Sequence, residues 1–310
     1  MTYLQRSDLK FNQNALPILS LNKFAWRVGI PLKKLEELAS NAEDFYSPFP
    51  KKTGTKERMI DNPTGFLKEV QYKINNRILG YILFPNYIIG GVKGQKPLNH
   101  PKRHIRRSVI VTIDAKECFP NITNKRVFDI WFRQLGCSST VARLATKLTT
   151  RKGHLPLGAF TSNCLANLAL LPCVKEAVQI ANRFHWSTPT QYIDDEAFSG
   201  NKLPKQLISL IIKGFSRRGI KIHRKKICIM RSNTSQRITG KIVNRKVAIP
   251  RSERNKVRAA LNELAKTNST DPMYSKHYRS VRGRISNLKN LHPQLAAKML
   301  KQFKTFKKPR

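Results

Sequence analysis

One hydrophobic run in the chain has the pattern of a buried strand. Residues 108–113 are mostly β-branched and lead directly into Asp114, which predicts a strand covered on both faces with a polar residue at its end. Residues 190–193 and 197–199 predict two further short strands. The turn expected between these two strands holds three acids, Asp194, Asp195 and Glu196.

Most other apolar positions follow a helical spacing. Residues 20–40 predict two short helices interrupted at 29–31, where Gly-Ile-Pro stands. This pair resembles a helix-turn-helix, but nothing else in the sequence supports sequence-specific DNA reading, so we interpret it as a packing layer for the main domain. Further helices are predicted over 66–83, from about Asn124, over roughly 161–180, within 204–249 and beyond Pro250.

The charge of the chain indicates what kind of partner it needs. The 310 residues carry 59 Lys and Arg against 18 Asp and Glu, a net charge of +41, and residues 201–310 hold 30 of these basic residues but 3 of the acidic ones. Such a charge repels itself and favours a polyanion, for which nucleic acid is the natural candidate. No stretch approaches 18 apolar residues and no signal-peptide pattern opens the chain, which argues against a membrane and for the cytoplasm. The five cysteines form no Cys-x-x-Cys pair, as expected for reduced thiols.

Two adjacent acids are costly in so basic a chain. Asp194 and Asp195 end an apolar segment, and like charges about 4 Å apart repel by about 4 kcal/mol at an effective dielectric of about 20. If the predicted strands are antiparallel neighbours, Asp114 joins them, and three such carboxylates suit the paired divalent ions of phosphoryl transfer. Because successive strand residues face opposite sides, we expect Asp114 and Asp194 to bridge the ions and Asp195 to complete or support the site. The alternative is a solvated acidic turn.

Several short motifs occur in order along the chain. A basic turn at 51–56 leads into Arg58-Met59-Ile60 and is followed by Pro63. The later motifs are 114–120 (DAKECFP), 155–162 (LPLGAFTS) with 165–168 (LANL), 192–195 (YIDD), 219–226 (GIKIHRKK), 236–240 (QRITG) and 281–283 (VRG). Over about residues 20–305 this ordered set resembles the reverse transcriptases, and within them the bacterial retron group.

The resemblance implies roles for individual residues. Arg58 would hold the triphosphate, Phe119 would be the steric gate against ribonucleotide 2′-hydroxyls, and Lys226 would lie near the incoming nucleotide. Two Mg²⁺ ions would be held by the three aspartates named above. The residues proposed to bind RNA come from the retron-like Asn-Ala-x-x-His and Val-Thr-Gly elements and from the basic tail: Asn99, His104, Ile238, Thr239, Gly240, Arg258 and Arg282.

The chain departs from the family pattern at several positions. Leu157 stands where the family has a glutamine, so a contact to the incoming nucleotide or template is lost. The Asn-Ala-x-x-His element is only half present at 99–104. All three positions of the metal ligands are intact, which favours an active enzyme. The other departures are Phe160 and Asn163 in place of prolines, His223 in place of asparagine, and the additional acid Glu196.

The resemblance implies an α+β fold of the right-hand polymerase type, with an antiparallel sheet in fingers and palm and a helical thumb. We expect an N-terminal helical extension at 1–49, fingers and palm at 50–249, and a basic helical thumb at 250–310. It implies RNA-directed DNA synthesis from dNTPs on a cognate structured non-coding RNA of the msr-msd type. The product would be branched, RNA-linked single-stranded DNA (msDNA), made in anti-phage defence with a separate effector protein.

Two other functions fit the same sequence. One is another bacterial reverse transcriptase, either intron-derived or defence-associated, that works without a retron RNA. The other is a non-enzymatic RNA-binding protein that keeps the polymerase fold. Inverted repeats and a folded transcript beside the gene would favour the retron.

Some candidate residues have a plain structural interpretation. His100 and His104 have the spacing of a helical metal pair, but Pro101 and the lack of companion ligands argue against zinc, and the basic residues around them favour RNA. Tyr274 and Tyr278 fit a helical core stripe better than a base-stacking platform. Beside Asp114, a solvated turn residue and a packing residue are expected at Glu117 and Cys118.

Overall fold

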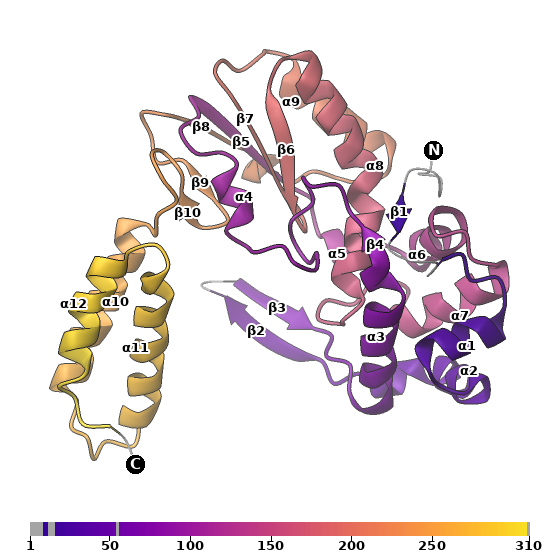
Figure 1. Ribbon diagram of the computed structural model, residues 1–310, viewed down its shortest axis with the longest axis horizontal. Coiled ribbons are helices and arrows are strands. Elements are labelled where there is room, and N and C mark those ends of the chain that lie inside the picture. Colours follow the sequence, from indigo (N-terminus) through magenta and orange to yellow (C-terminus); the bar gives the residue numbers. More distant parts are fainter. Residues whose placement is uncertain (1–8, 12–15, 54–55, 309–310) are drawn as a thin grey trace. The chain divides into compact units, whose positions relative to one another are not determined.

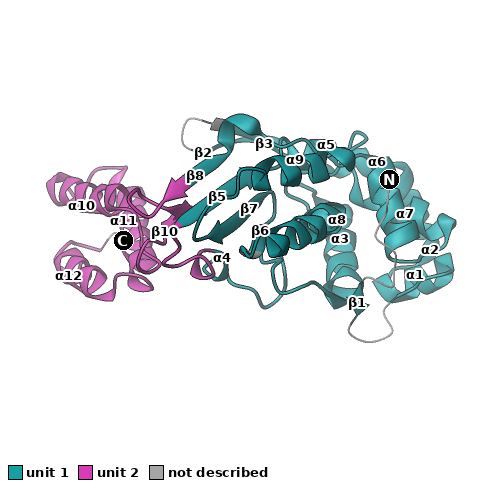
Figure 2. Cartoon of the chain, turned by 90° about the horizontal axis from the view of Figure 1, so that it is seen from above, with its two compact units in different colours: residues 1–100, 109–229 teal, residues 101–108, 230–310 magenta. Residues whose placement is uncertain are grey.

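The computed structural model describes residues 9–11, 16–53 and 56–308, and it forms two compact units (Figure 2). The first unit combines the residues up to 100 with 109–229, and the second combines 101–108 with 230–310. Each unit has a hydrophobic core of its own.

A four-stranded sheet forms the centre of the first unit, in the order β6-β7-β5-β8 (Figure 1). The buried strand predicted at 108–113 is β5 (Val109–Asp114). It pairs antiparallel with β7 (Asp195–Gly200), and Asp114 lies opposite Asp195 in this register. The other neighbour of β7 is the antiparallel β6 (Ser187–Tyr192), and the last strand is β8 (Cys228–Arg231).

The turn between β6 and β7 is shorter than predicted. Tyr192 pairs directly with Asp195, so the turn consists of Ile193 and Asp194 alone. Asp195 and Glu196 belong to β7, and their side chains face opposite sides of the sheet. Glu196 is fully buried, whereas Asp195 is partly exposed. The prediction of three acids within the turn is therefore wrong.

Two helices, α8 and α9, lie beside the sheet (Figure 1). Helix α8 (Ser162–Arg183) packs against β6 and against α9 (Leu207–Arg217). Among the described residues, α8 is the one helix long and apolar enough to cross a membrane, with a mean hydropathy of 1.4, although its sequence lacks an unbroken apolar run. Because 72% of that stretch is buried inside the protein, α8 serves here as a core helix.

The N-terminal helices form a packing layer, as expected. Helix α1 (Leu21–Val28) begins after Ser20, whose hydroxyl accepts a hydrogen bond from the Lys23 backbone, and it ends at the left-handed Gly29. Helix α2 is Leu32–Ser40. Residues from both helices are completely buried in the core of the first unit, among them Phe24, Val28 and Leu35.

The remaining elements complete the first unit, and one of them, α4, extends into residues 101–102 of the second. The helix predicted over 66–83 ends at Arg77, because Ile82 and Leu83 pair with Lys10 and Phe11 as a small sheet instead. The basic turn predicted at 51–56 contains residues 54–55, which lie outside the described residues. The elements are β1 (Lys10–Phe11), η2 (Ala42–Phe45), β2 (Phe49–Thr53), β3 (Lys56–Ile60), α3 (Gly65–Arg77), η3 (Leu79–Tyr81), β4 (Ile82–Leu83), α4 (Asn99–Lys102), α5 (Cys118–Asn121), α6 (Asn124–Asp129), η4 (Ile130–Gln134), α7 (Ser139–Thr149) and η5 (Arg224–Lys226).

The second unit contains a bundle of three helices, α10 (Arg251–Lys266), α11 (Tyr274–Lys289) and α12 (Pro293–Phe303), and a small hairpin of β9 (Arg237–Ile238) and β10 (Lys241–Ile242). Tyr274 is buried, and its hydroxyl donates to the Lys307 carbonyl at 2.8 Å. The core-stripe interpretation of Tyr274 is confirmed. The bundle core also contains Leu261, Leu264, Val281, Ile285, Leu288, Met299 and Phe303.

Candidate active site

A pocket of about 540 Å³ opens beside the end of β5 and the β6–β7 turn. Five segments that are far apart in the sequence line it, namely 58–61, 114–120, 154–157, Asp194 and 223–226. The structure therefore gathers around one cavity five of the six residues to which separate motifs assigned catalysis or nucleotide binding: Arg58, Asp114, Phe119, Asp194 and Lys226. The sixth, Asp195, is not among the residues that line the cavity but lies opposite Asp114 in the strand register.

Contacts from three segments fix Asp114. Its backbone carbonyl accepts a hydrogen bond from the His223 backbone N–H at 2.8 Å, and the next residue, Ala115, donates to the Asp194 carbonyl at 2.9 Å. Its side chain is 15% exposed and accepts a hydrogen bond from Lys226 Nζ on Oδ1 at 2.5 Å. The strand end, the 193–194 turn and the 223–226 segment are thus tied together around one carboxylate.

The acids around this pocket interact unfavourably with one another. Burial raises the pKa of Asp195 to about 6, and the negative charges of Asp194 and Asp114 add to the effect. Burial and the charge of Asp114 also raise the pKa of Asp194, while Arg58 and Lys226 lower it. The pKa of Glu196 is raised well above its usual range, again mainly by burial. Further positive charge at this point would relieve the repulsion.

The turn that carries Asp194 is strained. Ile193 has a φ of 59°, a left-handed conformation that is unfavourable for a β-branched residue. A buried amide network holds this turn: Gln191 Nε2 donates to the Ile193 carbonyl at 2.7 Å and to Asn167 Oδ1 at 3.3 Å. Asn167 Nδ2 in turn donates to the Gly90 carbonyl at 2.8 Å. Strained backbone supported from several sides is typical of functional sites.

Gly90 lies directly against the same turn. A Cβ at this position would lie 2.5 Å from the Ile193 backbone nitrogen, so a larger residue would push the turn away. The backbone N–H groups of Ile89 and Gly90 donate to the Gln191 carbonyl at 2.8 and 3.3 Å. The segment 88–91 therefore packs against the turn and fixes its position.

His100 supports the aromatic residue of the same motif. Its ring is stacked on that of Tyr192, with ring centroids 5.9 Å apart and planes inclined by 8°. Burial lowers the pKa of His100 to about 4, so the ring is neutral at physiological pH.

A family model for reverse transcriptases (RNA-dependent DNA polymerases) matches residues 49–256, which is more than half of the chain and includes every residue lining the pocket. The chain belongs to the reverse transcriptase family. The resemblance noted in the sequence is confirmed, and with it the α+β polymerase fold.

Curated relatives of this reverse transcriptase are retron enzymes. The retron Se72 reverse transcriptase of Salmonella heidelberg (strain 579083-10) is 31% identical over 157 residues, which cover 50% of this chain and 41% of the relative. The retron Mx65 reverse transcriptase of Myxococcus xanthus is 26% identical over 275 residues, or 82% of this chain and 63% of the relative. The chain thus spans less than two thirds of either. Among solved structures, a foamy viral protease-reverse transcriptase in complex with double-stranded DNA matches 100% of this chain and 49% of its own at 15% identity, with a TM-score of 0.48.

Membership of the reverse transcriptase family implies dependence on divalent metal ions. Asp114 and Asp194 offer oxygen donors to one pocket and Asp195 is paired beside them, which suits hard cations. Among the residues that the structure describes, no three or more His, Cys, Asp or Glu side chains are already arranged as an ion site.

The residues proposed to bind RNA differ in accessibility. Thr239 and Gly240 form the exposed turn between β9 and β10, and both have a positive φ. Arg258 and Arg282 are exposed on α10 and α11. Two members of the set are buried instead, His104 and Ile238, and one is partly buried, Asn99. The buried side chains can shape an RNA-binding surface but do not present their own polar atoms to it.

The residues that hold the 193–194 turn were not identified from the sequence. Gln191 and Gly90 contact it from buried positions, and among its supports only Asn167 belonged to a recognised motif. The sequence favoured RNA binding for His100, but this histidine is buried and stacked on Tyr192. A glutamine within the predicted strand 190–193 was the one available sign of this network. Gln191 is indeed buried, and a buried amide needs hydrogen-bond partners. Glu117 is exposed and Cys118 is buried, as expected, and burial raises the pKa of the Cys118 thiol. All five cysteines lie in the described part of the chain and are free thiols.

Proposed function

We propose that this protein is an RNA-directed DNA polymerase that extends a primer hydroxyl with dNTPs. One observation carries the proposal: the carboxylates of Asp114, at the end of β5, and Asp194, on the neighbouring hairpin, line a single pocket in a member of the reverse transcriptase family. Arg58 and Lys226 line the same pocket and supply the positive charge that a triphosphate requires.

Each residue of the pocket has a separate role in the proposed nucleotidyl transfer. Arg58 binds the triphosphate, and Phe119, which is 9% exposed, closes the pocket where a ribonucleotide would place its 2′-hydroxyl. Lys226 lies beside the incoming nucleotide. Two Mg²⁺ ions on Asp114, Asp194 and Asp195 would lower the pKa of the primer hydroxyl and offset charge on the phosphates. The product is a DNA strand complementary to the template, with pyrophosphate released.

We further propose that the enzyme is a cytoplasmic retron reverse transcriptase. Its template would be a structured non-coding RNA of the msr-msd type, and an internal guanosine 2′-hydroxyl would prime synthesis to give branched msDNA. The likeness to two curated retron enzymes supports this assignment. So do the exposed turn at 239–240 and the exposed arginines of the helical bundle, which can contact RNA phosphates. Anti-phage defence with a separate effector protein is the corresponding biological role.

We also propose how the chain divides into the parts of a right-hand polymerase. We assign residues 1–49 to an N-terminal extension, 50–249 to fingers and palm, and 250–310 to the thumb. The helical bundle begins at Arg251, immediately after Pro250, which supports the last of these boundaries.

Primer extension on RNA templates tests the proposed activity. Purified protein would be incubated with its co-purified RNA, dNTPs and Mg²⁺, and compared with Asp194→Asn and with Asp44→Asn, a control acid that is exposed on η2. We expect DNA product from the wild type and from Asp44→Asn, and none from Asp194→Asn. Equal product from all three proteins would remove these carboxylates from the reaction. No product from any protein across many folded RNAs would favour the non-enzymatic RNA-binding alternative.

A further inference from the structure

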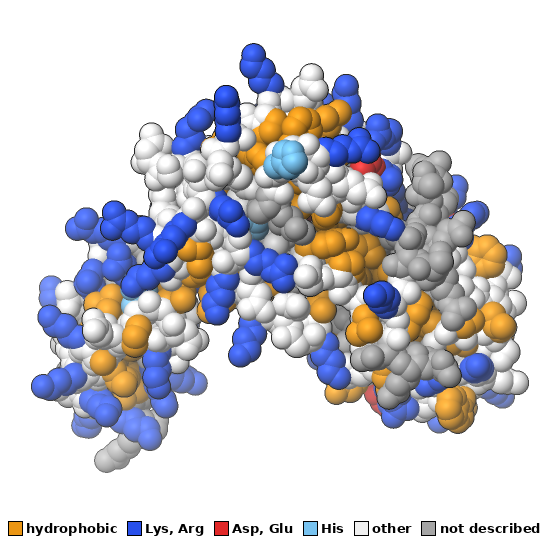
Figure 3. Space-filling model, turned by 45° about the horizontal axis from the view of Figure 1, so that its top comes forward, with side chains coloured by type: hydrophobic (Ala, Val, Ile, Leu, Met, Phe, Trp, Pro, Cys, Tyr) orange, Lys and Arg blue, Asp and Glu red, His pale blue; other side chains and the backbone are white. Residues whose placement is uncertain are grey.

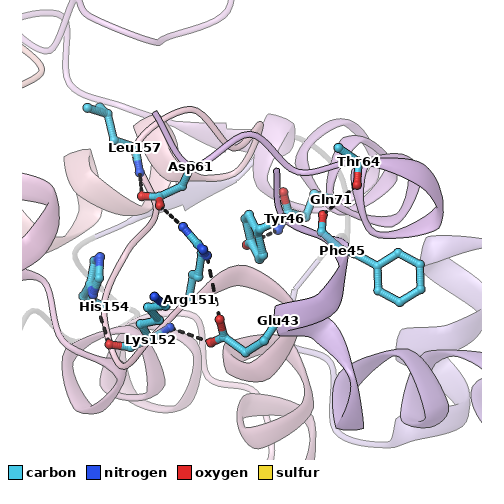
Figure 4. Close-up of polar contacts among 10 residues, drawn as sticks. All are labelled: Glu43, Phe45, Tyr46, Asp61, Thr64, Gln71, Arg151, Lys152, His154 and Leu157. Carbon is cyan, nitrogen blue, oxygen red and sulfur yellow. Dashed lines mark hydrogen bonds and ion pairs between the residues drawn. The ribbon is translucent and has the colours of Figure 1, made fainter. Parts of the chain in front are cut away.

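The part of the pocket lining formed by Asp61 and Leu157 is held by a buried ion pair. We infer that Asp61 and Arg151 are positioning residues for the incoming nucleotide: together they fix the segment Leu157–Gly158 against the end of β3 (Figure 4). The inference rests on the proposed polymerase function and adds two residues to its nucleotide site.

Asp61 holds Leu157 through two hydrogen bonds. The Asp61 backbone N–H donates to the Leu157 carbonyl at 2.7 Å, and the Leu157 backbone N–H donates to Asp61 Oδ2 at 3.1 Å. Both residues line the pocket, and Arg58 lies three residues before Asp61 on β3. The two bonds therefore set the separation between the strand that carries Arg58 and the Leu157 side of the pocket.

Gly158 shows how closely the two segments approach. Its φ is 122°, and a Cβ at this position would lie 2.8 Å from Ile60 Cγ2. The segment therefore lies flat against β3, with no room for a side chain between them. A change in the orientation of the Asp61 carboxylate would displace backbone atoms at the pocket wall.

Arg151 orients that carboxylate. Its Nη1 pairs with Asp61 Oδ1, which leaves Oδ2 for the Leu157 N–H. The Arg151 and Asp61 side chains are 10% and 13% exposed, so the pair is only weakly screened by water. The Arg151 guanidinium also lies 5.1 Å from the centre of the Tyr46 ring.

The rest of the network anchors Arg151 in the protein (Figure 4). Tyr46 accepts a hydrogen bond on its hydroxyl from Gln71 Nε2 at 2.9 Å, and burial raises the pKa of Tyr46 to about 12. Glu43 lies at the other end, 55% exposed, where it accepts a hydrogen bond from the Lys152 backbone at 2.6 Å and lies 3.8 Å from Arg151 Nε. The network thus has a buried end at the pocket and an exposed end at Glu43.

A purely structural role explains this pair less well. A buried ion pair contributes little net stability, because the cost of removing both charges from water offsets their attraction, and an apolar pair of similar volume is often as stable. Removing one partner is costly, since the other charge stays buried alone. Fold stability and nucleotide positioning can therefore be separated by changing one partner or both.

The test compares Arg151→Met with the double variant Asp61→Asn/Arg151→Met, and Asp44→Asn, which changes an exposed acid on η2 outside this network, serves as the control. The readouts are the melting temperature, KM and kcat for dNTP on an RNA template, and the Kd of the next dNTP for complexes with a dideoxy-terminated primer. For Arg151→Met we expect a lower melting temperature, KM and Kd raised roughly three- to tenfold, and kcat within about twofold. The double variant should recover melting temperature while KM and Kd stay raised. Asp44→Asn should leave KM and Kd unchanged.

Two results would overturn the inference alone. The first is that the wild type makes DNA and Arg151→Met binds the next dNTP with the same Kd as the wild type. The other is a KM that returns to the wild-type value together with the melting temperature in the double variant, because the pair would then act only on stability. A wild type that makes no DNA on any RNA would overturn the proposed function and this inference with it.

Discussion

At the scale of single residues, the site depends on opposite charges held at short range. Asp114 accepts a hydrogen bond from Lys226 across 112 positions of the chain, and Asp61 pairs with Arg151 across 90. Both members of the first pair line the pocket, and Asp61 of the second pair lines it as well. Each pair places a cation beside an acid of the pocket lining.

Phe119 offers a direct test of sugar selection. Its side chain is almost fully buried at the pocket, so Phe119→Ala would open space beside the sugar. We expect discrimination between dNTP and rNTP, measured as the ratio of their kcat/KM values, to fall at least about tenfold. Phe132→Ala, which changes an exposed phenylalanine that does not line the pocket, should leave the ratio unchanged. Unchanged selection in Phe119→Ala would exclude Phe119 as the gate.

His100 predicts a pH effect on stability. Its pKa is about 4 in the folded protein against 6.5 in the unfolded chain, so the unfolded state binds more protons between these values. The contribution of the neutral ring, up to about 3 kcal/mol, is present above pH 6.5 and is lost as the pH falls towards 4. His100→Phe keeps an aromatic ring against Tyr192 but takes up no proton.

Urea unfolding at pH 7 and pH 5 measures this contribution. The free energy of unfolding should fall less in His100→Phe than in the wild type between the two pH values. Asp195 and Glu196 are present in both proteins, so their own titration cancels in the comparison. An equal fall in both proteins would show that His100 is not the group responsible.

At the scale of elements, the β6–β7 hairpin shows what could be predicted from the sequence. The β-branched run at 108–113 was sufficient to predict a strand that ends at Asp114, because strand periodicity is a local signal. That this strand is an antiparallel neighbour of the strand after Asp194 was an assumption, which the pairing of β5 with β7 confirms. The length of the turn was mispredicted, since it depends on the pairing of Tyr192 with Asp195. The network of Gln191 and Asn167 was missed because its contacts form only in the folded chain.

The structure of the β6–β7 hairpin also predicts that a second substitution can restore activity lost by a first. Gln191→Met removes the hydrogen bond to the Ile193 carbonyl, so the left-handed turn should relax and kcat should fall about tenfold. Adding Ile193→Asn should restore part of kcat, because asparagine tolerates the left-handed conformation without that support. Single-turnover extension measures both variants. If the losses in the double variant simply add, Gln191 does not act through the turn.

At the scale of the whole molecule, positive charge is the dominant property. Lys and Arg side chains are spread over the face shown in Figure 3, where acidic side chains are few. A net charge of +41 needs a polyanion to offset its self-repulsion, and a structured RNA or an RNA–DNA hybrid supplies one. The sequence predicted this partner class directly, because charge is a property of composition. It gave no information on which RNA is bound, since phosphate contacts carry no base sequence.

Salt dependence of RNA binding tests the role of the helical bundle. Arg258→Gln/Arg282→Gln should weaken binding and make the plot of log Kobs against log salt concentration shallower by roughly 0.7 to 0.9 for each arginine. Lys33→Gln/Lys34→Gln, on exposed positions of α2, is the matched control and should leave the slope unchanged. Equal slopes for all three proteins would mean that these arginines contact no phosphate.

The most direct test of the account is to locate the metal. Crystals of the protein with a primer, an RNA template and Mn²⁺ would show the ion by anomalous scattering. We predict anomalous density beside the carboxylates of Asp114 and Asp194 that disappears in Asp194→Asn. Ordered Mn²⁺ bound elsewhere, with these carboxylates empty in a complex that still synthesises DNA, would contradict the account.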